Sequence, residues 1–153
     1  MLAAGDSVPD VGAQDQDGRH VGLRDFAGRR LVVYFYPRAD TPGCTAETQA
    51  FQDGKGELDA SGAAVVGVSR DTVAHQKKFA QKYGVNFPLL ADTGSAICDA
   101  FGVIVEKNMY GKKSIGIQRS TFLIGPDGTI ARVWPRVSVE GHAAAVLEAV
   151  RSR

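Results

Sequence analysis

Cys44 is the residue of this sequence whose type and surroundings most favour chemistry. It follows a continuous apolar run over residues 31–36 and a short loop, and it stands where a helical pattern begins. Ligands of open α/β sheets bind at the carboxyl ends of strands, and the free N–H groups of a helix N-terminus stabilise an anion. These conditions favour a thiolate, the nucleophilic form of a cysteine. Thr41 adds a hydroxyl that can bond the sulfur or an oxygen ligand, and Gly43 leaves room for a substrate.

The alternative is that Cys44 is a small apolar residue that fills space at a helix start. That is the usual fate of a single cysteine. Its neighbours, however, are threonine, proline and glycine, and they do not continue an apolar stripe. The local sequence therefore favours a reactive thiol over a packing role.

The composition is typical of one globular domain, which we expect to span residues 1–153, with 44% apolar and 23% charged residues. A formal net charge of +1 argues against a protein that binds nucleic acid or an anionic membrane. Two cysteines are too few for a disulfide framework. Residues 1–6 lack the pattern of a secretory signal, and the apolar run is far too short to span a membrane. We therefore expect a cytoplasmic protein with reduced cysteines.

Apolar patterning predicts strands that alternate with helices, and hence an α/β fold. The expected architecture is a mixed central sheet flanked by helices on both faces, with an N-terminal β-hairpin. Gly54 and Gly56 should weaken the middle of the first helix. The strands are expected at 11–14, 20–23, 31–36, 63–69, 87–91, 120–124 and 129–134, and the helices at 44–60, 73–83, 92–101 and 140–153.

Residues 36–45, with the sequence YPRADTPGCT, closely resemble the active-site signature of peroxiredoxins, Pro-x-x-x-Thr-x-x-Cys. The TPGCT version resembles the bacterioferritin comigratory protein, or PrxQ, subfamily. Residues 25–26, 67–69 and 119–124 extend the likeness over almost the whole chain. The resemblance implies a thioredoxin-like fold and a thiol-dependent peroxidase that needs no metal or organic cofactor.

The same resemblance assigns roles to individual residues. Cys44 matches the cysteine that attacks a peroxide and becomes a sulfenic acid, and Thr41 matches the residue that hydrogen-bonds the peroxide. Pro37 matches the residue that shields the site from water. Arg119 matches the arginine that polarises the peroxide and holds the thiolate, although its position alone would suggest an arginine on the surface. Glu47 either orients Arg119 or is an ordinary charge at a helix start.

The sequence departs from the subfamily pattern at the resolving cysteine. Many members carry a second cysteine five residues after the first, and here that position is Gln49. Cys98 is the only other thiol in the chain. In one account Cys98 resolves Cys44 after local unfolding of the first helix; in the other an external thiol attacks the sulfenic acid. We favour the external thiol, with electrons from thioredoxin, glutaredoxin or a low-molecular-weight thiol.

Two further functions compete with a peroxidase. The chain could be a redox-sensing or chaperone-like module switched by oxidation of Cys44, or a thioredoxin-like disulfide reductase, which the lack of a Cys-x-x-Cys motif disfavours. His20, His75 and His142 stand in no metal-binding spacing with the cysteines. No nucleotide-binding glycine motif occurs. We expect a monomer whose partners are a peroxide and a thiol reductant.

Overall fold

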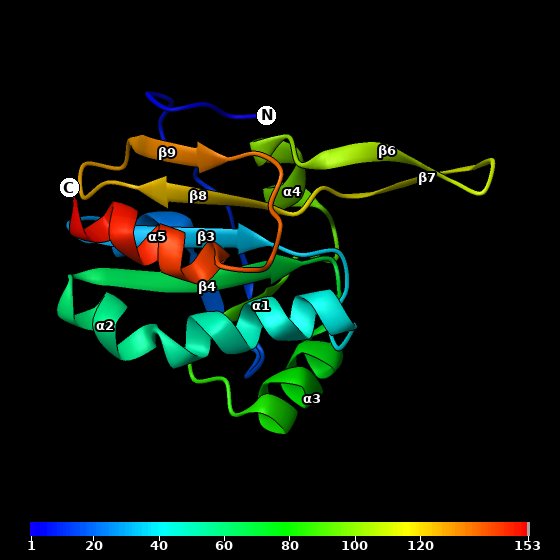
Figure 1. The fold of residues 1–153 in the computed structure, drawn as a ribbon, viewed down its shortest axis with the longest axis horizontal. Helices are drawn as coiled ribbons and strands as arrows, with labels where there is room; N and C mark the ends of the chain where they lie inside the picture. Colours follow the sequence, from blue (N-terminus) through cyan, green and yellow to red (C-terminus); the bar gives the residue numbers. More distant parts are fainter. Residues whose placement is uncertain (153) are drawn as a thin grey trace.

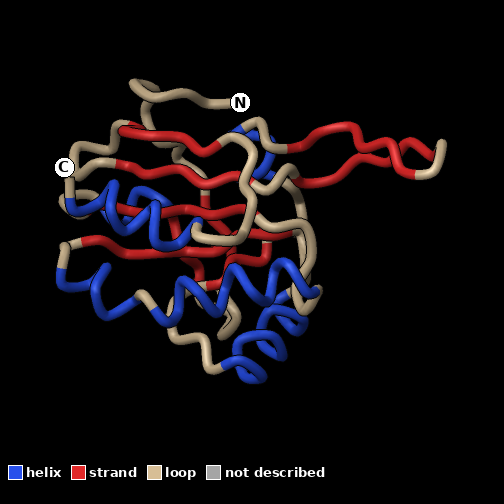
Figure 2. Tube along the Cα trace, viewed as in Figure 1, coloured by secondary structure: helices blue, strands red, loops and turns tan. Residues whose placement is uncertain are grey.

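The computed structural model describes residues 1–152, apart from the side chain of Met109. Seven strands form one mixed sheet in the order β2-β1-β5-β4-β3-β8-β9. Figures 1 and 2 show β4, β3, β8 and β9 of this sheet side by side, with helices against it. Strands β3, β4 and β5 run parallel, whereas β8 pairs antiparallel with β3, and β1 and β2 form the predicted N-terminal hairpin. The strands are β1 (Gly12–Gln14), β2 (His20–Gly22), β3 (Arg30–Phe35), β4 (Ala63–Ser69), β5 (Leu89–Ala91), β8 (Ser120–Ile124) and β9 (Ile130–Trp134).

Strands β3 and β4 are central because their side chains are apolar on both faces. Every residue of β4 is buried, and so is every residue of β3 after Arg30. Continuous apolar runs of this kind are typical of parallel strands that are covered on both sides. The prediction of two central strands is confirmed.

The predicted helical segments appear in the predicted order, and only the one at Val73–Tyr83 has the predicted bounds; the short 3-10 helix at Leu23–Phe26 was not predicted. The helices are η1 (Leu23–Phe26), α1 (Pro42–Asp53), α2 (Lys55–Ala60), α3 (Val73–Tyr83), α4 (Ala96–Phe101) and α5 (His142–Arg151). The helix expected over 44–60 is interrupted at Gly54, one of the two glycines expected to weaken it, and forms α1 and α2. Helix α3 has the predicted bounds, with the Thr72 side chain accepting the His75 amide at its start and Gly84 left-handed at its end.

Two apolar clusters cover the two faces of the sheet. Val32 and Tyr34 of β3 contribute to one cluster, together with side chains of α1, α2, α3 and α5. Val33 and Phe35 point the other way and contribute to a second cluster with η1 and α4. Alternate residues of a strand face opposite sides of a sheet, so β3 separates the two clusters. Helices on both faces are therefore confirmed.

The hairpin of β6 (Ile104–Met109) and β7 (Lys112–Ile117) was not predicted. It pairs as a separate two-stranded ribbon and extends away from the body of the molecule (Figure 1). Tyr110 and Gly111 form its turn, both at positive φ, which suits a two-residue hairpin turn. Tyr110 is 97% exposed and Ile115 is 70% exposed. Within residues 1–152, no helix has the length and apolar character needed to cross a membrane.

Candidate active site

The loop Tyr36–Thr41 joins the end of β3 to the start of α1 and places Cys44 in the first helical turn. Pro42 occupies the first helical position, where its missing N–H costs nothing. Thr41 is the N-cap in an extended conformation, but its side chain does not cap the helix. Its hydroxyl donates to the Arg38 carbonyl at 2.8 Å instead. The first-turn amides beside Cys44 therefore have no side-chain cap, which leaves their partial positive charge available to an anion.

The pairing between β3 and β8 brings Arg119 to Cys44, although 75 residues separate them in the sequence. Phe35, the last residue of β3, lies opposite Ser120, the first residue of β8. Arg119 immediately precedes β8, and its Nη2 donates to Cys44 Sγ at 3.4 Å. Cys44 is only 1% exposed and the Arg119 side chain 17%, so this contact is largely shielded from solvent.

Glu47 is the second partner of this guanidinium. Arg119 Nη1 donates to Glu47 Oε1 at 2.8 Å, so the structure contains the ion pair that was one of two interpretations of Glu47. Glu47 is 1% exposed, and its Oε2 has no hydrogen-bond partner among the described residues. Burial raises the pKa of Glu47 to about 7, against the opposing effect of Arg119. One permanent cation thus contacts both the Cys44 thiol and the Glu47 carboxyl, and the charge of the Glu47 carboxyl changes near neutral pH.

Other groups around the site respond to the charge of Arg119. Burial works against the charge on Arg119, but Glu47 and Cys44 outweigh it and raise its pKa. Burial, with a contribution from Arg119, lowers the pKa of His142 to about 4. The His142 ring is hydrogen-bonded to the Thr121 hydroxyl at 2.7 Å. Burial and Arg119 also lower the pKa of Lys107, on the β6–β7 ribbon. Burial is the larger cause of the shifts at His142 and Lys107, and the charge of Arg119 adds to it.

Cys98 lies on α4, and both cysteines are free thiols. Cys98 belongs to the apolar cluster on the opposite face of the sheet from the cluster that contains Cys44. Its amide donates to Asp92 Oδ2 at 2.8 Å, and its side chain is fully buried. Burial, assisted by the neighbouring Asp92 carboxylate, raises the pKa of Cys98. The structure thus does not bring the two thiols together.

Pro37 is the predicted site residue that this geometry supports least. It lies exposed at the surface, two residues after the end of β3. Cys44 is instead buried in the apolar cluster that includes Tyr34, Tyr36 and Ala39. The shielding role of Pro37 stays a prediction.

Comparison with known proteins identifies the family. The AhpC/TSA family matches residues 4–133. Peroxiredoxin Bcp of Xanthomonas campestris is 50% identical over 135 residues, which cover 88% of this chain and 84% of that protein. Peroxiredoxin Bcp of Escherichia coli is 43% identical over 146 residues, 95% of this chain and 94% of that protein. This chain is a peroxiredoxin of the AhpC/TSA family.

Solved structures place this peroxiredoxin in the Bcp/PrxQ subfamily. The bacterioferritin comigratory protein of Xanthomonas campestris matches with a TM-score of 0.92 and 45% identity, over 97% of this chain and 98% of that one. PrxQ of Xylella fastidiosa matches with a TM-score of 0.95 and 38% identity, over 99% and 97%. The thioredoxin-like fold is confirmed, and the protein is a thiol peroxidase.

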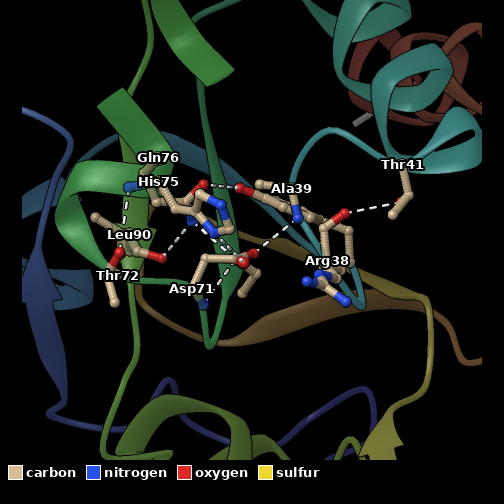
Figure 3. A network of polar contacts seen from close by, with 10 residues as sticks. Arg38, Ala39, Thr41, Asp71, Thr72, His75, Gln76 and Leu90 are labelled. Carbon is tan, nitrogen blue, oxygen red and sulfur yellow. Dashed lines mark hydrogen bonds and ion pairs between the residues drawn. The ribbon is translucent and has the colours of Figure 1, made fainter. Parts of the chain in front are cut away.

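Sequence analysis missed several residues that shape the site of this peroxiredoxin. The Tyr34 hydroxyl is 2.9 Å from the Thr48 hydroxyl, which ties the end of β3 to α1. Gly67 makes room for the Tyr34 ring, since a Cβ there would lie 2.8 Å from it. The Asp71 carboxylate accepts a hydrogen bond from the Ala39 amide in the loop before Cys44 (Figure 3). These contacts join residues distant in sequence, and no local pattern marks them.

Proposed function

We propose that Cys44 is the peroxidatic cysteine of this thiol peroxidase and that it reduces hydrogen peroxide and alkyl hydroperoxides. The observation that carries the proposal is the 3.4 Å contact between Arg119 Nη2 and Cys44 Sγ in a nearly dry site. A buried thiolate needs a cation beside it, because an unpaired charge in the interior is costly. The Xanthomonas campestris relative has alkyl peroxide reduction activity, which supports alkyl hydroperoxides as substrates here.

In the proposed reaction the thiolate attacks the terminal oxygen of ROOH. The S–O bond forms as the O–O bond breaks, and RO⁻ takes a proton and leaves as ROH. Cys44 becomes a sulfenic acid. Arg119 stabilises the thiolate before the attack and the negative charge on the departing oxygen during it. Thr41 already donates its hydroxyl proton to Arg38, so its oxygen is left to accept a hydrogen bond from the peroxide O–H.

We propose that an external thiol completes the cycle. Two molecules of RSH reduce the sulfenic acid, releasing water and the disulfide RSSR and regenerating the Cys44 thiol. Gln49 provides no thiol in the first helix, and Cys98 lies beyond the sheet with a raised pKa, so its thiol is a poor nucleophile. Thioredoxin, glutaredoxin or a low-molecular-weight thiol would supply the electrons, to a protein that we expect to act as a monomer.

A peroxide-consumption assay with thioredoxin and thioredoxin reductase tests the proposal. Wild type and Cys98→Ser should both turn over many equivalents of peroxide, whereas Cys44→Ser should consume none. Retained turnover in Cys44→Ser would refute the role of Cys44. A single stoichiometric oxidation in wild type, with no further turnover under any of the three reductants, would instead support a redox sensor.

Mass spectrometry after one equivalent of peroxide tests the external thiol. With dimedone present, the expected product is a sulfenic acid adduct on Cys44. An intramolecular disulfide between Cys44 and Cys98 in wild type would overturn the external thiol while leaving the peroxidase intact.

A further inference from the structure

One peptide group in the loop before α1 is held on both of its sides. The carbonyl of the Arg38–Ala39 peptide accepts the Thr41 hydroxyl at 2.8 Å. The N–H of the same peptide donates to Asp71 Oδ2 at 2.7 Å (Figure 3). Because a peptide group is planar, the direction of its N–H fixes the direction of its carbonyl. The Asp71 carboxylate therefore determines where the Thr41 hydroxyl proton points.

Asp71 is itself held in place by several donors. The Ser69 hydroxyl donates to Asp71 Oδ2 at 2.6 Å, and His75 Nδ1 lies 3.3 Å from Oδ1. Gln76 donates to Ser69 Oγ at 2.9 Å and accepts the Tyr36 hydroxyl at 2.6 Å. The Asp71 side chain is only 9% exposed. A short carboxylate in such a network has little freedom to follow the loop if the loop moves.

The loop needs this support because part of it is strained. Asp40, the next residue, has a φ of +60°, a left-handed conformation that is unfavourable for a residue with a side chain. The Asp40 carboxylate accepts hydrogen bonds from Tyr83 at 2.7 Å and Lys82 at 3.1 Å, both on α3. Asp71 and Asp40 thus fix the loop to the start and the end of the same helix.

We propose that Asp71 is a positioning residue of the peroxidase reaction. It acts through the Arg38–Ala39 peptide, which directs the Thr41 hydroxyl proton to the Arg38 carbonyl and leaves the Thr41 oxygen to accept a hydrogen bond from the peroxide. This inference rests on the proposed function, in which Thr41 accepts a hydrogen bond from the substrate. If the inference is right, substituting Asp71 lowers kcat/KM only when residue 41 has a hydroxyl. If Asp71 only stabilised the fold, the substitution would have the same effect with or without that hydroxyl.

A double-mutant cycle on kcat/KM for hydrogen peroxide tests this dependence. Asp71→Ala should lower kcat/KM about tenfold, the order expected when a hydrogen bond to a charged group is lost. In a Thr41→Val background the same substitution should change kcat/KM by less than about twofold, because the hydroxyl it orients is gone. Asp71→Asn should restore most of the activity, since its amide oxygen can still accept the Ala39 N–H.

Asp17→Ala is the matched control, because Asp17 is an exposed carboxylate that also bonds α3, through Lys77 at 2.8 Å. It should leave kcat/KM unchanged. If Asp71→Ala does not unfold cooperatively, Asp71→Ser replaces it with the same expected ratios, since a serine is too short to bridge to Ala39. An equal loss in the wild-type and Thr41→Val backgrounds, or no loss in either, overturns the inference. Wild-type turnover in the same assay shows separately whether the proposed function holds.

Discussion

Arg119 Nη2 lies 3.4 Å from Cys44 Sγ, although 75 residues separate the two in the chain. The contact depends on the antiparallel register that sets Ser120 opposite Phe35, so that the residue before β8 meets the helix after β3. The same guanidinium bonds Glu47, which makes one cation the neighbour of two acidic groups.

Removing the guanidinium should disable the site without unfolding it. We expect Arg119→Ala to lower the second-order rate constant for peroxide by about 10²–10³-fold, the range found for loss of a group that stabilises charge in a transition state. Stopped-flow measurement of peroxide consumption checks this result. Arg136→Ala, at an exposed position beyond β9, is the control and should match wild type. Equal rates in the two variants would contradict the role of Arg119.

Gly43 sets the distance between Arg119 and the helix that carries Cys44. A Cβ at this position would lie 3.1 Å from Arg119 Nη2, closer than an ordinary contact, so the guanidinium would have to shift by a few tenths of an ångström. We expect Gly43→Ala to keep the fold and to lower the rate constant for peroxide several-fold, since misplacement by about 1 Å can cost about 10²-fold. Gly56→Ala, where nothing lies within 4 Å of the added Cβ, should leave the rate unchanged. A Gly43→Ala enzyme with the wild-type rate would show that this spacing is not critical.

Glu47 should make stability depend on pH. Its pKa is raised from 4.5 to about 7, so the neutral carboxyl stabilises the fold fully below pH 4.5, and this contribution is lost as pH rises through 7. The shift corresponds to about 3 kcal/mol in the free energy of unfolding. Urea unfolding between pH 5 and 8.5 should show that the free energy of unfolding of Glu47→Gln rises relative to that of wild type as pH rises, by up to this amount. Parallel curves for the two proteins would mean that Glu47 is ionised throughout.

His142 should make the free energy of unfolding depend on pH in the opposite direction to Glu47. Its pKa is lowered from 6.5 to about 4, so the neutral ring contributes stability above pH 6.5 that is lost as pH falls through 4. Unfolding of His142→Gln should therefore show a smaller loss of stability than wild type on acidification. The readout is the difference in urea midpoint between pH 7 and pH 4. If this difference is the same in His142→Gln and in wild type, the His142 imidazole is charged in the native protein at pH 4.

The sequence predicted the central strands and α3 well, because each is marked locally. Residues 63–69 are continuously apolar, and α3 has a threonine before it and a glycine after it. The β6–β7 ribbon lacked such a signal. Charged residues such as Lys107, Lys112 and Lys113 interrupt its apolar pattern, and its Tyr-Gly turn is a less common hairpin sequence than Asn-Gly.

For the site, Cys44 and Thr41 could be found from one short segment, because the motif that contains them is local. Arg119 could be assigned only from the family resemblance, since its place beside Cys44 follows from strand pairing across 75 residues. The separation of Cys98 from Cys44 depends on which face of the sheet α4 covers, and no spacing in the sequence fixes that face. The hydrogen bond from Ala39 to Asp71 is likewise a tertiary contact.

The ribbon of β6 and β7 also affects how copies of this protein meet in a concentrated solution. In the described residues the two strands pair only with each other, so each has an outer edge that could accept a strand from another copy. Lys112 and Lys113 are exposed residues of β7, and Lys113 pairs with Glu106 of β6 at 3.6 Å. Repulsion between the Lys112 side chains of two copies opposes pairing between their strands. High salt screens that repulsion. Purification at moderate ionic strength should therefore keep the protein dispersed, whereas concentrating it at high salt favours self-association through the ribbons.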